Sequence, residues 1–256
     1  MKTVHEILNY LWTVAPEKGK EPWDNVGHLV GRRNAEVDHI LVSLDITMPV
    51  IQEAAEKGAQ LLVSHHPLIW DTYKHVTDSV FQQDKVLTLA EHKIAAICMH
   101  TNLDEAEDGV DDTLVETLGL TPECHLAEGT IGHVSTLPEP MALQDFLCVV
   151  KEKLHANGLR YCDSGRPVHR IATGCGSCGE YLADAVKAGC DTFITGDVKY
   201  SVMIDALGQG VNLIDAGHYP TENPIVAKLQ RKLQAQFPEI HVEIAENIAQ
   251  PDQFFI

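Results

Sequence analysis

Two adjacent histidines, His65 and His66, follow the apolar run 61–63 and are the residues best suited to chemistry in this chain. Successive side chains of a strand point to opposite faces, so these two cannot be ligands on one strand face. Where the backbone turns at a strand end, however, the two imidazoles can diverge towards two nearby metal ions. Imidazole suits zinc, iron, nickel and copper. The pair therefore indicates a metal site, although two unrelated loop histidines would give the same local pattern.

Two further apolar runs, 94–99 and 211–214, also end at residues that bind metals. The first run is followed by His100 and Asp104, and the second by Asp215, His218 and Glu222. In open α/β sheets, binding sites form beyond the carboxyl ends of the strands. Three strand-length runs that stop at such residues therefore favour one shared site over three coincidences.

The spacing within these segments adds a weaker signal. His218 and Glu222 are four residues apart, as are His100 and Asp104. If a helix begins at either place, the two members of each pair share one helical face. An ordinary surface hydrogen bond between histidine and carboxylate would show the same spacing.

Several of these segments resemble a known family. SHHPLIW, HTNLD, TGDVKYS and DAGHYPTE, with WDNVG near the amino terminus, are similar to the dinuclear-metal family of NGG-one-interacting-factor-three-like proteins, whose members carry the name GTP cyclohydrolase 1 type 2 homolog. The resemblance implies two α/β lobes, a ring-shaped homohexamer and two divalent ions per subunit, with zinc, iron, manganese and nickel all open. The metal ligands that it implies are His65, His66, Asp104, His218 and Glu222, with Glu222 bridging both ions.

Other residues near these motifs have open roles. His100 is a candidate catalytic base or a sixth ligand, or it only forms hydrogen bonds in the cleft. We expect Asp24 to orient a ligand histidine, and we expect Asp45 to cap the helix that follows it. Lys199 and Tyr200 are candidate contacts to a substrate phosphate, with plain surface positions as the alternative.

A glycine-rich stretch at 174–179 has the spacing of a dinucleotide-binding fingerprint and lies between an expected strand and an expected helix. Such a pattern by itself is weak evidence for a cofactor, but its backbone N–H groups could hold a phosphate. The same stretch contains Cys175 and Cys178, a CxxC pair with no second pair beside it. We interpret these two as ordinary thiols in a turn.

Composition limits the classes of function. The chain has 256 residues, 45% hydrophobic and 22% charged, which is ordinary for a globular protein. A formal charge of -18 argues against a general nucleic-acid binder. The sequence shows neither a membrane-length apolar stretch nor a signal peptide. Seven cysteines, an odd number, favour a reduced, cytoplasmic setting over a disulfide framework.

Hydrophobic periodicity predicts an α/β fold with mainly parallel sheets in two lobes, the second inserted in the first. We expect a metal-binding lobe from 1–124 and 215–256, an inserted lobe from 125–214, and a break in the pattern at 121–130. The histidines outside the motifs are expected on the surface, namely His5, His39, His75, His92 and His155. Helices are expected at 4–14, 48–57, 80–91, 110–118, 143–154, 180–187 and 225–237, and strands at 39–44, 60–64, 94–99, 171–173, 192–194, 211–214 and 240–244.

Two functions fit this sequence. The first is a metal-dependent hydrolase of the GTP cyclohydrolase 1 type 2 type that acts on a nucleotide or a phosphoester, since the chain offers no Gly-x-Ser-x-Gly elbow and no P-loop. The second is a protein that stores, delivers or senses metal without catalysis. The ligand set does not separate them, because five ligands for two ions leave positions open for either water or exchange.

Overall fold

The computed structural model describes residues 1–127, 131–248 and 250–255. The chain forms two compact units: the first contains residues 1–106 and 226–249, and the second contains residues 107–225 and 250–256. The sequence-based division at 124 and 215 differs from these bounds and stays a prediction.

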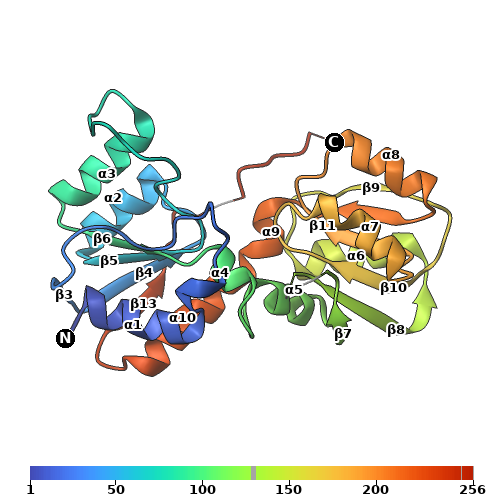
Figure 1. Ribbon diagram of the computed structural model, residues 1–256, viewed down its shortest axis with the longest axis horizontal. Helices are drawn as coiled ribbons and strands as arrows, with labels where there is room; N and C mark the ends of the chain where they lie inside the picture. The colour runs from blue at the N-terminus through green and yellow to red at the C-terminus, as the bar shows by residue number, and fades with distance from the viewer. Residues whose placement is uncertain (128–130, 249, 256) are drawn as a thin grey trace. The chain divides into compact units, whose positions relative to one another are not determined.

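The first unit is built on a five-stranded sheet in the order β13-β4-β5-β6-β2 (Figure 1). The four strands β13 to β6 are parallel, and only β2 runs antiparallel to its neighbour β6. The strands of the first unit are β1 (Lys2–Thr3), β2 (Gly27–Val30), β3 (Glu36–Val37), β4 (His39–Ser43), β5 (Leu61–Ser64), β6 (Ala95–Cys98) and β13 (His241–Ile244). Its helices are α1 (Val4–Val14), η1 (Glu17–Gly19), α2 (Met48–Lys57), α3 (Phe81–Glu91), α4 (Thr101–Asp104) and α10 (Pro224–Gln236).

Local signals explain the helix that follows β4. Thr47 caps α2 by accepting a hydrogen bond from the N–H of Val50, and a proline occupies the first turn, where its fixed φ suits a helix. Gly58 ends the helix in the left-handed conformation at φ 71°, which a glycine adopts without steric cost. The chain then returns as β5, parallel to β4.

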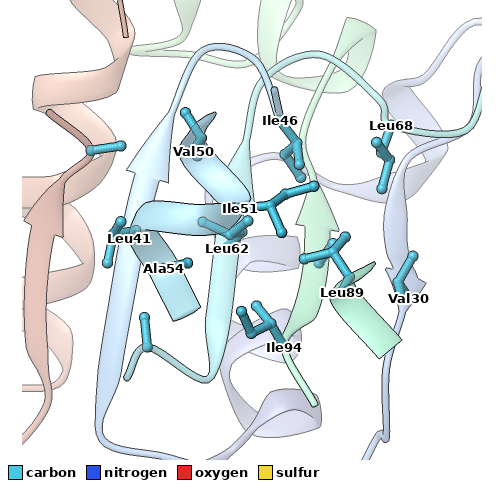
Figure 2. Close-up of a cluster of buried hydrophobic side chains, with 13 residues drawn as sticks. Val30, Leu41, Ile46, Val50, Ile51, Ala54, Leu62, Leu68, Leu89 and Ile94 are labelled. Carbon is cyan, nitrogen blue, oxygen red and sulfur yellow. The ribbon is translucent and has the colours of Figure 1, made fainter. Parts of the chain in front are cut away.

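The core of the first unit lies between its sheet and helices α2 and α3. Leu41, Leu62 and Ala96 are aligned on neighbouring strands and pack against Val50 and Leu89 of these helices (Figure 2). Helices α1 and α10 lie on the opposite face of the sheet (Figure 1). A parallel sheet covered on both faces has apolar residues along both sides of its strands, and this explains the unbroken apolar runs in the sequence.

The second unit contains a six-stranded sheet in the order β7-β8-β10-β11-β12-β9. Its central strands β10, β11 and β12 are parallel, and the flanking pairings are antiparallel. The expected α/β class is thus confirmed, with a mixed sheet in this unit. Its strands are β7 (Pro122–His125), β8 (His133–Met141), β9 (Arg160–Cys162), β10 (Val168–Thr173), β11 (Thr192–Thr195) and β12 (Asn212–Asp215). Its helices are α5 (Val110–Leu118), α6 (Leu143–Lys153), η2 (Gly179–Tyr181), α7 (Leu182–Lys187), α8 (Tyr200–Gly208) and α9 (His218–Glu222).

Fully buried Phe193 belongs to the core of the second unit, together with residues of the sheet and of α7 and α8. The expected break at 121–130 is occupied in part by β7, which pairs with β8 at the edge of this sheet; residues 128–130 lie outside the described residues. No helix in the described part of the chain is long and apolar enough to cross a membrane.

Truncation of Leu62 should test the packing of the first unit. Leu62 is fully buried, so we expect Leu62→Ala to lower the free energy of unfolding by about 2–5 kcal/mol. All three tryptophans, Trp12, Trp23 and Trp70, belong to the first unit. Urea unfolding followed by tryptophan fluorescence therefore reports on this unit. Val76→Ala, at a side chain that is 43% exposed, is the control and should change stability little; equal losses in both variants would contradict the assigned core.

Candidate metal centre

The first unit gathers its polar groups at the carboxyl edge of its sheet. Strands β4, β5 and β6 run parallel in adjacent positions, so the residues that follow them emerge side by side. Asp45 follows β4, His65 and His66 follow β5, and His100 follows β6. The backbone continues this alignment past the strand ends, because the N–H of His66 donates to the carbonyl of Leu44. The convergence expected for the first two motifs is therefore present.

All three imidazoles of this edge are held in the same way. The Nδ1 atom of each ring lies within hydrogen-bond distance of an oxygen atom, so Nε2 is the ring nitrogen that remains for a metal ion. The acceptors are the carbonyl of Met99 for His65 at 2.9 Å, Asp45 for His66 at 2.8 Å and Asp24 for His100 at 2.9 Å. One ring nitrogen from each of the three histidines lies within 4.8 Å of the others. A ligand imidazole normally donates its second N–H to a carbonyl or carboxylate, which fixes the tautomer.

Asp24 supports His100 in the expected way. Burial alone would raise the pKa of Asp24, but hydrogen bonds from His100 and Thr101 outweigh it and lower the pKa to about 2. The carboxylate also accepts from the Thr101 N–H at 3.0 Å. It is therefore ionised at neutral pH and fixes both the imidazole and the start of α4.

The expectation that Asp45 caps a helix is wrong. Thr47 is the N-cap of α2, and the Asp45 carboxylate contacts His66 instead. Both residues precede the helix and both have a side-chain oxygen, so the sequence did not separate them. The geometry gives Asp45 the orienting role that was expected for Asp24 alone.

Asp104 lies beside His65 in the first unit. Its Oδ1 atom is 3.5 Å from Nε2 of His65, which is long for a hydrogen bond. Two donors that each lie about 2.0–2.2 Å from one tetrahedral zinc ion are about 3.3–3.6 Å apart. The separation thus suits two ligands of one ion. His65 is fully buried and the Asp104 side chain is 23% exposed.

The second unit repeats this arrangement at the carboxyl edge of its own sheet. Asp197 follows β11 and His218 follows the parallel neighbour β12. Asp197 Oδ2 lies 2.8 Å from Nδ1 of His218, and Nε2 of the same ring lies 3.0 Å from Oε2 of Glu222. If the proton is on Nδ1, a nitrogen lone pair faces a carboxylate oxygen. Such a contact requires a second proton or a shared cation between the two atoms.

The glycine-rich turn at 174–179 makes room for Glu222. Gly176 has a φ of +58°, and a Cβ atom at this position would collide with Oε1 of Glu222. The N–H groups of the turn donate within the unit, from Gly176 to Thr221 at 3.0 Å and from Cys175 to Asp111 at 2.9 Å. These two N–H groups are therefore used within the unit, and the close approach of Glu222 explains the glycine at position 176.

Three residues near these groups, Trp23, Trp70 and Asp197, were not predicted from the sequence to have a role there. Trp23 and Trp70 are 63% and 51% exposed, and both rings meet His100 edge-on, with centroids 6.0 and 5.2 Å away. Both tryptophans stand inside the quoted motifs, which was an available signal. Asp197 also stands inside a quoted motif, TGDVKYS, but was given no role. Lys199 and Tyr200 are exposed after β11, and their contact to a phosphate stays a prediction.

Comparisons with known proteins agree with the motifs. The model of the family Duf34/NIF3 (NGG1p interacting factor 3) matches residues 2–251. A Clostridium acetobutylicum protein named GTP cyclohydrolase 1 type 2 homolog is 34% identical over 98% of both chains. A Clostridium perfringens protein of the same name is 32% identical over 98% of this chain and 99% of its own.

Solved structures show the same fold. A hypothetical protein of Staphylococcus aureus has a TM-score of 0.91 and 29% identity, with 99% of both chains covered. A Bacillus cereus protein related to NIF3 has a TM-score of 0.93 and covers 100% of this chain and 99% of its own. Its identity of 22% supports similarity of fold alone.

Substitution of Gly176 should separate backbone strain from an effect on Glu222. Gly176 and Gly165 both have positive φ, at +58° and +79°, but a Cβ at Gly165 would meet nothing within 4 Å. We expect alanine at either position to cost about 1–2 kcal/mol of stability through its left-handed backbone. Only Gly176→Ala should displace Glu222 and weaken metal binding, by about 10- to 100-fold. Metal titration and urea unfolding measure the two effects, and equal metal affinity in both variants would contradict this role of the turn.

Proposed function

Because this chain belongs to the Duf34/NIF3 family, we propose that it binds two divalent metal ions and acts as a metal-dependent hydrolase of a nucleotide or phosphoester. The proposed ligands are His65, His66, Asp104, His218 and Glu222. The names of its relatives, GTP cyclohydrolase 1 type 2 homologs, suggest a nucleotide ring as the group attacked.

The observation that carries this proposal is the common state of the three ligand histidines. His65, His66 and His218 each place Nδ1 against an oxygen acceptor and keep Nε2 for a further contact. Histidines that serve only for packing would not all be expected to share this Nδ1 contact. A metal ligand does need it, because the ring must be neutral with its lone pair on one defined nitrogen. Imidazole together with carboxylate suits zinc, iron, nickel and manganese.

Two bound ions would polarise the substrate and lower the pKa of a water molecule towards neutrality. His100 is the proposed catalytic base. The ionised Asp24 keeps a proton on Nδ1 of this ring, so Nε2 is the atom that accepts a proton from water and returns it to the leaving group. One ring nitrogen of His100 also lies within 4.8 Å of ring nitrogens of His65 and His66, so His100 as a further ligand is the alternative.

Metal storage or delivery remains the rival function. The tryptophans beside His100 favour an enzyme, because Trp23 and Trp70 present exposed aromatic surface next to the candidate ligands. Aromatic faces stack well on planar rings such as nucleobases. Storage or delivery of an ion needs no such surface.

Metal analysis of variants tests the ligand set. We expect His65→Ala and Glu222→Gln to lose metal, with the greater loss for Glu222→Gln because a bridging ligand serves both ions. The exposed His75→Ala is the control and should keep its full metal content. Turnover on a panel of nucleotides and phosphoesters should disappear after chelation and return with a divalent metal. If both ligand variants bind two ions per chain as tightly as the wild type, the assignment is wrong.

The His100→Gln variant separates its two roles. Loss of turnover with full metal content identifies a base, whereas loss of metal identifies a ligand. Full metal content without turnover in the wild type, across the whole panel, would favour metal handling over hydrolysis.

We also propose a cytoplasmic homohexamer, which rests on the family resemblance and on the cysteine usage. One face of α8 supports self-association, because Tyr200, Ile204 and Leu207 recur at helical spacing and are 79%, 49% and 42% exposed. Contiguous exposed apolar surface of this kind often marks a protein contact.

Light scattering measures the oligomer directly. We expect a mass of about six times the 28.2 kDa chain, since the ring implied by the resemblance has six subunits. Ile204→Lys should dissociate the assembly by placing a charge in an apolar contact. Asp205→Lys, exposed on the same helix, is the control for added charge. A monomeric wild type at micromolar concentration would contradict the proposal.

A further inference from the structure

We infer that His39, His241 and Glu243 form a second, separate binding site for a divalent ion that accepts imidazole ligands, such as zinc. The site lies in the first unit, where β4 and β13 begin at His39 and His241. His65, His66 and His100 of the candidate metal centre follow the carboxyl ends of strands in the same sheet. The second site therefore lies at the opposite ends of the strands.

Strand register places the three side chains together. Strands β13 and β4 are parallel, and His241 is aligned with His39. Side chains two residues apart on a strand share a face, so Glu243 points to the same side as His241. Aligned neighbours on adjacent strands also share a face, which adds His39. The three ligand types thus project from one surface of the sheet by backbone geometry alone.

The three ligand atoms lie close enough for one ion once the shortest contact, a hydrogen bond, opens to the roughly 3.3–3.6 Å that separates two ligands of one zinc ion. Oε1 of Glu243 lies 2.7 Å from Nε2 of His39 and 3.7 Å from Nε2 of His241. The two imidazole rings are tilted, with centroids 4.6 Å apart, and the three ligand atoms all lie within 4.8 Å of one another. One carboxylate oxygen is therefore directed at both histidines. An ion at this point replaces the proton that now joins His39 to Glu243.

The charges around the cluster favour a cation. Lys57 contacts the other oxygen of Glu243 at 3.3 Å, and it also pairs with Glu53 at 3.0 Å and Glu246 at 2.8 Å. Three carboxylates surround one ammonium group, which leaves a local excess of negative charge. Lys57 holds Glu243 by Oε2, whereas Oε1 is the oxygen that contacts the two histidines.

Exposure makes this site accessible. The His241 side chain is 65% exposed, whereas those of His39 and Glu243 are 13% and 28% exposed. Two histidines and one glutamate form the ligand set of several zinc sites, with water in the fourth position. A bound ion would join the edge strand β13 to β4. The simpler alternative is a hydrogen-bonded network of His39, Glu243 and Lys57 in which His241 has no role.

Zinc titration of the full chain distinguishes these two interpretations. The starting protein is the His65→Ala/Glu222→Gln double variant, in which the candidate metal centre is disabled. Calorimetry should detect one remaining zinc ion per chain, and adding His241→Ala should weaken its binding at least tenfold. His92→Ala, also exposed and in the first unit, is the matched control and should leave the affinity unchanged. Ring-nitrogen NMR signals of His39 and His241 should shift together as zinc is added.

The proposal is overturned if His241→Ala binds zinc as tightly as its parent, or if zinc moves neither of these NMR signals. The His241→Ala variant is suited to this test because an exposed side chain can be removed without loss of the fold. The wild type separates the two metal proposals. If the wild type binds three zinc ions per chain and His241→Ala binds two, both proposed sites are supported. If the number of bound ions falls only in His65→Ala or Glu222→Gln, the second site is wrong and the candidate metal centre still stands.

Discussion

The parallel alignment of neighbouring strands is the constraint on which the candidate metal sites of this protein depend. Each strand end in the first unit contributes polar groups to the same edge, and each contributed imidazole is then fixed by an oxygen acceptor at its Nδ1 atom. The alignment of the strands therefore sets where each imidazole ring lies. One hydrogen bond at Nδ1 then sets that Nε2 is the nitrogen that remains for a ligand. Both units use this combination, with His65 and His66 in the first and His218 in the second.

Local signals made much of the fold predictable. The helices at 48–57 and 110–118 have the expected bounds, because left-handed glycines end them and caps and apolar spacing are short-range features. Strand β8 is absent from the strands predicted from the sequence, because Pro138 and Pro140 argue against a strand inside a sheet. The structure accommodates both in an irregularity, where Thr136 and Met141 pair with residues only two apart on β10. Such compensation depends on a partner strand that is distant in sequence.

The arrangement of the candidate site residues was predictable where they lie in motifs and unpredictable where it depends on strand pairing. His65, His66 and Asp104 come together in the first unit as expected. His39 was expected on the surface, yet its side chain is mostly buried against Glu243. That contact joins residues 204 positions apart, through a register between β4 and β13 that no local pattern reveals. Asp45 illustrates the same limit at short range, since two interchangeable cap residues compete for one helix end.

The discontinuity of the first unit has a consequence for folding during synthesis. Helix α10 and strand β13 complete this unit, but they follow the entire stretch 107–225 of the second. Until they emerge, Tyr10 lacks its ring contact with Phe237, and β4 presents an open backbone edge where β13 will pair. Open edges recruit foreign strands. The six strands of the second unit's sheet all precede α10 and β13 in the chain, so this sheet can form first on the ribosome. The amino-terminal half meanwhile keeps an exposed strand edge, and such edges make a partly folded chain prone to aggregation.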